Sequence, residues 1–287
     1  MRPAVHVAPI DRFRSTGFTL IELTVVILIL AILSASVGVF IASPVRSYFE
    51  SIDRAKLTNA GNSTIRRITR ELQSAAPNSA RITTSGGTTY LEYVPIVDGG
   101  RYRHAVSNNF PSQNNPLIVT SSSNTSFGVL GPTINAPSGS QLVVWNLGTG
   151  NSNLYSGTNI RSVTNPGAAL QTINFSPAGV WPGDSPGYRF QIVTTAVTYA
   201  CTPNGNGTGT LTRYSGYAIQ TSQPSSTSSA PLSTATSSLA LNNVTGCTFT
   251  PGSVSVDLNA VQMTLQLTDS NGETVSLYSQ AHTPNTP

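Results

Sequence analysis

The residue whose chemistry most needs an explanation is Glu22, a lone carboxylate near the start of an otherwise apolar stretch. A charge at the centre of a bilayer costs about 2.5–3.5 kcal/mol on insertion scales, so a carboxylate in such a segment calls for a cationic partner. If the chain were cut after Gly17, the new α-amino group of Phe18 would supply that cation. In a staggered bundle of identical helices, the amine of one subunit would meet the carboxylate of its neighbour. This pairing would set the axial register of an assembly.

The segment that follows Glu22 is long and apolar enough to cross a membrane. No charged residue occurs from Leu23 to Val45, and a helix of that length spans about 35 Å, against about 30 Å for a hydrocarbon core. Arg12 and Arg14 precede the segment and Arg46 follows it. By the positive-inside rule, the leader favours a cytoplasmic N-terminus and an exported C-terminal body.

The order of small and apolar residues bears on how the N-terminus is processed. An ordinary secretory signal places small residues after its apolar core, so that the core is removed with the leader. Here the small residue Gly17 comes before the apolar run. Two alternatives stay open at this point: a conventional cut near Ser34–Ser36, and a plain membrane anchor without processing. Neither alternative gives Glu22 a partner.

The heptapeptide GFTLIEL, from Gly17 to Leu23, resembles the processing signature of type IV pilins and type II secretion pseudopilins. The resemblance implies that a membrane aspartyl peptidase cuts after Gly17 and methylates the new N-terminal Phe18, and that Glu22 is the family's acidic position. The implied partners are the prepilin peptidase/N-methyltransferase, other pilin subunits in a filament, and the inner membrane before assembly. The leader of residues 1–17 is longer than many in the family, and Thr24 stands where a bulkier apolar residue is common. Neither departure touches the cut.

The charge composition argues against an electrostatically driven partner. Charged residues make up 9% of the sequence, against about a quarter in an ordinary soluble domain, and this suits an exported β-rich protein. The formal charge of +4 is partly due to the leader, since a chain starting at Phe18 carries 12 basic and 10 acidic residues. So balanced a charge creates no long-range field, and we expect no nucleic-acid partner.

The two cysteines, Cys201 and Cys247, both fall in the β-rich region. An even count in an exported chain favours one disulfide. Zinc is a poor alternative, because no histidine pair lies near the two thiols in sequence. A bridge closing a ring of this size contributes about 4 kcal/mol in the chain-entropy treatment.

No group of residues suggests catalysis, a metal site or a cofactor. Of the three histidines, His6 is in the leader, and His104 and His282 are far apart in sequence. The segment Asp269–Glu273 looks superficially like a calcium loop, but it lacks spaced acidic ligands and is better explained as a turn. The glycines in Gly205–Gly209 have no phosphate-binding lysine beside them. We therefore expect no catalytic residue, no metal and no cofactor.

Helical periodicity continues beyond the apolar segment. Pro44 lacks an N–H and crowds the preceding turn, so we expect a helix kink there. The pattern resumes at Val45 and runs to Ala76, where Pro77 ends it. The expected organisation is a leader at 1–17, a helix at 18–76 with its transmembrane part at about 18–43, and a β-rich head at 77–287.

Three arginines, Arg66, Arg67 and Arg70, cluster on the outer half of this helix. Such a cluster suits either a solvated helix face or a nucleic-acid contact of the kind a DNA-uptake pilin would need. The solvated face is the favoured interpretation.

Beyond Pro77 the pattern changes to short alternating or β-branched runs, which predict strands. The clearest hairpin joins Val261–Leu267 to Thr274–Ser279 through Asn271-Gly272, which favours a type I′ turn. Two polar stretches, Ser107–Ser140 and Thr221–Ser238, are predicted to be exposed loops. The other predicted strands are Tyr90–Val94, Gln141–Trp145, Tyr188–Val193, Ala196–Cys201 and Thr210–Ile219.

These elements predict an α+β fold in which a long, kinked, transmembrane N-terminal helix packs on a mainly antiparallel β head. The stretches Phe49–Arg81, Leu91–His104 and Leu277–Pro287 also resemble minor pilins of the mannose-sensitive haemagglutinin (MSHA) type. That resemblance implies a structural subunit, not an enzyme, which starts in the inner membrane with a periplasmic head and then joins a pilus. The alternatives are a J-type pseudopilin of type II secretion and a membrane-anchored adhesin that never polymerises.

Overall fold

The structure is a computed structural model that describes residues 17–104, 115–251 and 260–283. The chain divides into two compact units, Met1–Ile52 and Asp53–Pro287, and the boundary falls within one long helix, α1 (Leu20–Gln73). Apart from Gly17, the predicted leader with its arginines and His6 lies outside the described residues. The predicted α+β fold, a long apolar N-terminal helix plus a mainly antiparallel β-rich domain, is confirmed.

In the first unit, α1 exposes large apolar side chains on all its faces. Phe18 and Phe40 are both 80% exposed, and many leucine, isoleucine and valine side chains between them are exposed as well. This is the one helix in the described part of the chain that is long and apolar enough to span a bilayer. Pro44 lies within α1, which continues as helix on both sides of it. The kink expected at Pro44 stays a prediction.

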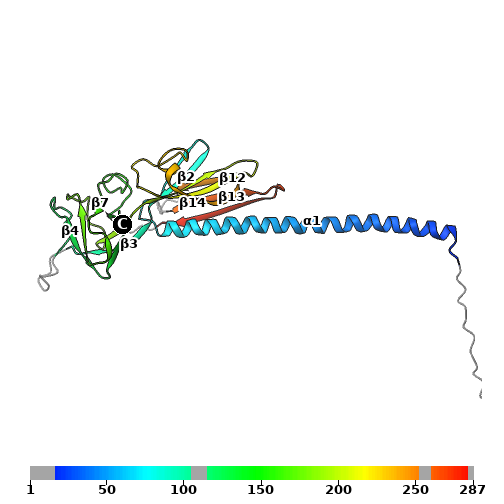
Figure 1. Cartoon of the computed structure of the whole chain (residues 1–287), viewed down its shortest axis with the longest axis horizontal. Helices are drawn as coiled ribbons and strands as arrows, with labels where there is room; N and C mark the ends of the chain where they lie inside the picture. Colours follow the sequence, from blue (N-terminus) through cyan, green and yellow to red (C-terminus); the bar gives the residue numbers. More distant parts are fainter. Residues whose placement is uncertain (1–16, 105–114, 252–259, 284–287) are drawn as a thin grey trace, which may run out of the picture. The chain divides into compact units, whose positions relative to one another are not determined.

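In the second unit, the outer part of α1 packs on one face of a seven-stranded antiparallel sheet (Figure 1). Leu57, Ile65, Ile68 and Leu72 are buried against the sheet. The strand order is β1-β2-β11-β12-β13-β14-β15. The strands are β1 (Arg81–Ser85), β2 (Thr88–Tyr93), β11 (Ala196–Thr202), β12 (Gly209–Tyr217), β13 (Thr236–Pro251), β14 (Ala260–Thr268) and β15 (Thr274–His282).

Between the neighbouring strands β2 and β11, the chain leaves the sheet and forms a closed six-stranded barrel, in the order β10-β3-β4-β9-β7-β6. Figure 1 labels three of its strands, β3, β4 and β7. A two-stranded sheet, β5-β8, accompanies the barrel. The strands are β3 (Ile96–Tyr102), β4 (Ser126–Leu130), β5 (Ile134–Ala136), β6 (Gln141–Val144), β7 (Ile160–Val163), β8 (Gly167–Leu170), β9 (Thr172–Ser176) and β10 (Arg189–Val193).

Two of the sequence expectations for the loops are wrong. The predicted loop Ser107–Ser140 contains β4 and β5, because Phe127, Ile134 and Ala136 are buried while the residues around them are small or polar and mostly face outward. The predicted loop Thr221–Ser238 contains a short 3-10 helix, η2 (Leu232–Thr234), and the start of β13. The five other predicted strands are present as β2, β6, β10, β11 and β12.

The predicted C-terminal hairpin is β14-β15, but its turn is not type I′. A type I′ turn needs positive φ at both central residues, and of Asn271 and Gly272 only Gly272 has one, at 86°. The turn instead runs over Asp269–Gly272, where the Gly272 N–H donates to the Asp269 carbonyl. The Asp269 carboxylate accepts the N–H groups of Asn271 and Glu273 at 2.9 and 2.8 Å, so it serves the turn.

A polar joint connects the sheet to the barrel. The buried Asn146 side chain donates to the Pro77 carbonyl at 2.5 Å and accepts the Leu154 N–H at 2.7 Å. The Tyr155 hydroxyl donates to the Ser79 carbonyl at 2.7 Å, and the Arg81 guanidinium stacks on the Tyr155 ring. An apolar cluster with members from both parts surrounds these bonds. The barrel is therefore fixed to the segment that follows α1.

A second polar network holds α1 to the sheet through Glu71, whose side chain is 23% exposed. Its carboxylate accepts the Tyr93 and Tyr199 hydroxyls and pairs with Arg67 and Arg213, each at 3.0 Å. Burial raises the pKa of Glu71, but the hydrogen bonds from Tyr93, Arg67 and Arg213 outweigh it and leave the pKa below its ordinary value. Glu71 is therefore a charged anchor for the helix.

Replacing Glu71 with glutamine should destabilise the head by about 2 kcal/mol at neutral pH, since two arginines lose their counter-ion. Because the folded pKa is depressed, the wild-type carboxylate stabilises the fold fully above its unfolded value of 4.5. The advantage of the wild type over Glu71→Gln should then shrink as pH falls below about 4. Urea denaturation of both proteins across this pH range measures it.

A matched control is Glu50→Gln, which removes an exposed i,i+4 partner of Arg46 and should change the unfolding free energy by less than about 0.5 kcal/mol. A stability gap between wild type and Glu71→Gln that is independent of pH would show that Glu71 acts by packing rather than by charge.

The structure contains the disulfide Cys201–Cys247, which joins β11 to β13. These strands flank β12, which begins at Gly209. Cys201 pairs with Leu211 on β12, whereas Cys247 lies beyond the Gly209–Val244 pair, where β13 pairs with β14. Cys201 belongs to the buried cluster under α1.

Replacing both Cys201 and Cys247 with alanine should cost about 4 kcal/mol of unfolding free energy, because the open ring gives the unfolded chain more freedom. The check is a urea denaturation of wild type and double variant, each with and without reductant. Reductant should lower the unfolding free energy of the wild type toward that of the variant and leave that of the variant unchanged. If reductant present during unfolding does not change the unfolding free energy of the wild type, the disulfide is contradicted.

Candidate processing and assembly site

The segment before α1 is non-helical, and the helix begins at Leu20 with a capping box. The Thr19 hydroxyl accepts the backbone N–H of Glu22 at 3.3 Å, and the Glu22 carboxylate accepts the Thr19 N–H and hydroxyl, each at 3.4 Å. This reciprocal pattern satisfies N–H groups that a helix start leaves free. Sequence reasoning missed it, although its signal, Thr-x-x-Glu, stands inside the heptapeptide.

The capping box shows how Glu22 is held in a single chain. Bonds of 3.4 Å are longer than the usual 2.7–3.2 Å range, so the carboxylate is weakly held. Within the described residues no cation lies within ion-pairing distance of Glu22. The charge is thus positioned at the first turn and remains available to a stronger partner.

The proposed scissile bond, Gly17–Phe18, is open on all sides. Phe18 is 80% exposed, and both residues lie outside α1. A Cβ added to Gly17 would meet no heavy atom within 4 Å, and Gly17 does not have positive φ. The fold itself therefore places no demand for glycine at position 17, and any such demand must come from a molecule that binds the segment.

The apolar residues between Phe18 and Phe49 give this site its surroundings. Their large side chains are exposed in the single chain, and an apolar surface of this extent marks a membrane or protein contact. A helix satisfies its backbone groups internally, so lipid or other apolar helices can both cover it. Among the described residues, no other apolar helix covers this surface.

The described residues contain little that resembles an enzyme site. His104 stacks on Tyr188 at 4.5 Å, and its Nδ1 lies 3.4 Å from Asp184. His282 is on β15, and within the described ranges no hydrogen bond, ion pair or ring contact joins it to His104. No group of three or more metal-binding side chains occurs in the described part of the chain.

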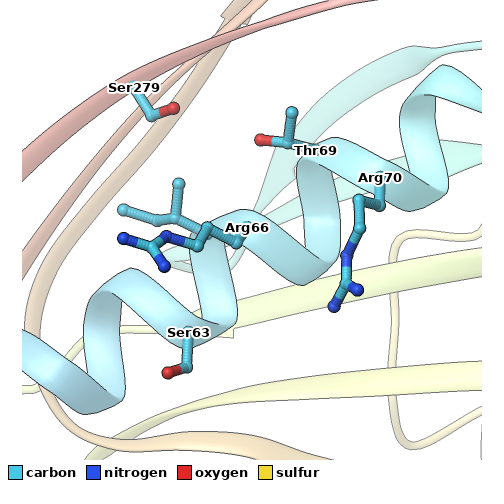
Figure 2. Close-up of a pocket in the computed structure, with 6 residues that line it drawn as sticks. Ser63, Arg66, Thr69, Arg70 and Ser279 are labelled. Carbon is cyan, nitrogen blue, oxygen red and sulfur yellow. The ribbon is translucent and has the colours of Figure 1, made fainter.

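The arginine cluster on α1 does not act as one cationic face. Arg67 pairs with Glu71, while Arg66 and Arg70 are exposed and line a hollow of about 580 Å³ with Thr69 and Ser279 on β15. Figure 2 shows the Arg66 and Arg70 side chains pointing in different directions. Divergent guanidinium groups do not clamp one phosphate, and this supports the interpretation as a solvated face.

The comparison with known families bears directly on the site at the start of α1. The prokaryotic N-terminal methylation motif matches residues 12–38. The chain carries this motif. It supports a type IV pilin or pseudopilin-type subunit, a structural rather than catalytic class, and implies prepilin peptidase processing and pilin assembly. Together with the apolar helix, it suggests membrane anchoring. No curated protein and no solved structure matches the chain.

Proposed function

We propose that the protein is a minor pilin of a type IV pilus of the MSHA type. The observation that supports the proposal is the match to the methylation motif at residues 12–38, a range that includes Gly17, Phe18 and Glu22. The chain is cut after Gly17 and methylated on Phe18. The segment 18–76, which contains α1 (Leu20–Gln73) and has its transmembrane part at about 18–43, anchors it in the inner membrane with the head, 77–287, in the periplasm.

Assembly then transfers the apolar helix from lipid into a bundle of neighbouring helices. The weakly held Glu22 carboxylate leaves its capping contact with Thr19 and pairs with the methylated amine of a neighbouring Phe18. A charge-assisted bond in a medium of low dielectric is stronger than the 3.4 Å contact that it replaces. The exchange fixes the axial register, and a kink at Pro44 adjusts the direction of the helix. The head then contributes to initiation or adhesion.

The cut is tested by intact mass and N-terminal analysis of the membrane-extracted protein, with and without its prepilin peptidase. We expect a chain that begins at methylated Phe18. Gly17→Val should remain uncut, because the open space around Gly17 means that the peptidase, not the fold, selects glycine. Gly38→Ala is the matched control, since Gly38 is equally open. An intact Met1 or a cut near Ser36 in the wild type would refute the proposal.

Assembly is tested with Glu22→Gln, which keeps the size of the side chain and the cap but removes its charge. The variant should be processed normally, yet its incorporation into filaments should fall at least about tenfold, the equivalent of losing about 1.4 kcal/mol at the inter-subunit pair. Immunoblots of sheared filaments and of membranes measure the ratio. Glu50→Gln is the control.

Wild-type incorporation by Glu22→Gln would favour the non-polymerising adhesin. Recovery of the wild type only in a short periplasmic filament would favour a J-type pseudopilin, which shares the motif.

A further inference from the structure

The barrel has a hollow on its outer face, over strands β3 and β10. On the adjacent strands β3 and β10, Arg101 stands directly opposite Arg189, and Gly99 stands opposite Gln191. Side chains two residues apart on a strand share a face, so these four positions lie together. Because Gly99 has no side chain, a hollow of about 350 Å³ opens there.

Among the described residues, the two arginines have no acidic partner. Neither guanidinium makes an ion pair or a hydrogen bond within the described ranges. Both lie beside Gly187, since a Cβ added there would be 3.5 Å from Arg101 Nη2 and 3.8 Å from Arg189 Nε. Asp98, the nearest acid in sequence, instead accepts the N–H groups of Gly99 and Asn135, each at 2.7 Å. Like charges directly opposite each other destabilise a strand pair. Repulsion between the two guanidinium groups therefore destabilises the unliganded protein, and a bound anion would offset it.

Gln191 adds a polar group that also lacks a partner. Its side chain is 6% exposed, and its Oε1 is buried without any donor in the described part of the chain. A buried acceptor without a hydrogen bond is rare in native proteins and calls for an explanation. Gln191 lines the hollow, so rotation of its amide group on ligand binding would bring Oε1 to a donor of the ligand.

We propose that this hollow binds an acidic sugar. The guanidinium groups of Arg101 and Arg189 bind its carboxylate, and a ring hydroxyl donates to Gln191 Oε1. The apolar face of the ring packs on Pro77 and Ile96, which also line the hollow. The volume suits one sugar ring.

The surroundings of the hollow disfavour other polyanions. A peptide that adds to a sheet needs a free strand edge. β10 is paired on both sides, with β3 and β6, and β3 is paired with β10 and, at Arg101 and Tyr102, with β4. A nucleic acid needs an extended basic surface, and the whole chain carries only +4. A bounded hollow with two arginines and an amide fits a single ring with one acidic group.

The test is isothermal titration of the detergent-solubilised full chain with tri-galacturonate, in parallel with D-galactose and inorganic phosphate. We expect saturable binding of tri-galacturonate, at least about tenfold weaker binding of phosphate, and none of galactose. Arg101→Gln and Arg189→Gln should each weaken tri-galacturonate binding about tenfold or more, whereas Arg66→Gln, an exposed arginine elsewhere, should leave it unchanged.

Gln191→Leu separates binding from folding. Removing the orphaned acceptor should leave the melting temperature of the apo protein unchanged or higher, yet weaken tri-galacturonate binding at least about fivefold. No binding by the wild type, equal binding of phosphate, or equal losses in Arg66→Gln and Arg101→Gln would overturn the proposal. The titration needs neither processing nor assembly, so either result leaves the proposed function standing.

Discussion

The structure depends on one constraint: a long helix whose apolar side chains are exposed among the described residues carries a carboxylate at its first turn. The surface from Phe18 to Phe49 cannot remain in water, and Glu22 cannot be left unpaired in lipid or in a helix bundle without a large cost. Only a neighbour that offers both an apolar face and a cation satisfies both requirements. Under the proposed function, a second copy of the processed chain offers both, because its new N-terminus lies just before its own apolar helix.

The same helix shows two ways of holding a carboxylate. Glu71 accepts hydrogen bonds from two tyrosines and two arginines, and this network requires β2, β11 and β12 to be in place. Glu22 has only the long contacts of a capping box with Thr19. A saturated carboxylate fixes an element, whereas a weakly held one can exchange partners. The outer part of α1 is thus committed to the head, and its first turn is left available for assembly.

How much the sequence predicts depends on whether a signal is local. The heptapeptide, the strands and the β14-β15 hairpin are contained in short segments, so they could be recognised directly, and two cysteines allow only one intramolecular pair. The barrel could not be recognised from the sequence. It is inserted between β2 and β11, which are neighbours in the sheet although Tyr93 and Ala196 lie about a hundred residues apart in the chain. Its short strands alternate weakly, as in β4 and β5. The Glu71 network likewise joins residues that no sequence spacing connects. The Thr-x-x-Glu capping box is also a local signal, so the sequence contains enough to predict it. It was missed because Glu22 was interpreted by its charge alone.

The position of the barrel explains how the head can combine two roles. Since the barrel is inserted between β2 and β11, which still pair directly, its presence does not disturb the helix-sheet unit. The bonds of Asn146 and Tyr155 to the segment after α1 fix it on that unit. Closure leaves the barrel without a free strand edge, so its side chains, not backbone pairing, decide what it contacts. Arg101, Arg189 and Gln191, whose side chains have no ion pair or hydrogen bond among the described residues, stand on β3 and β10 of the barrel and not on α1 or the seven-stranded sheet. A subunit built in this way can present a binding face without compromising the elements that assembly requires.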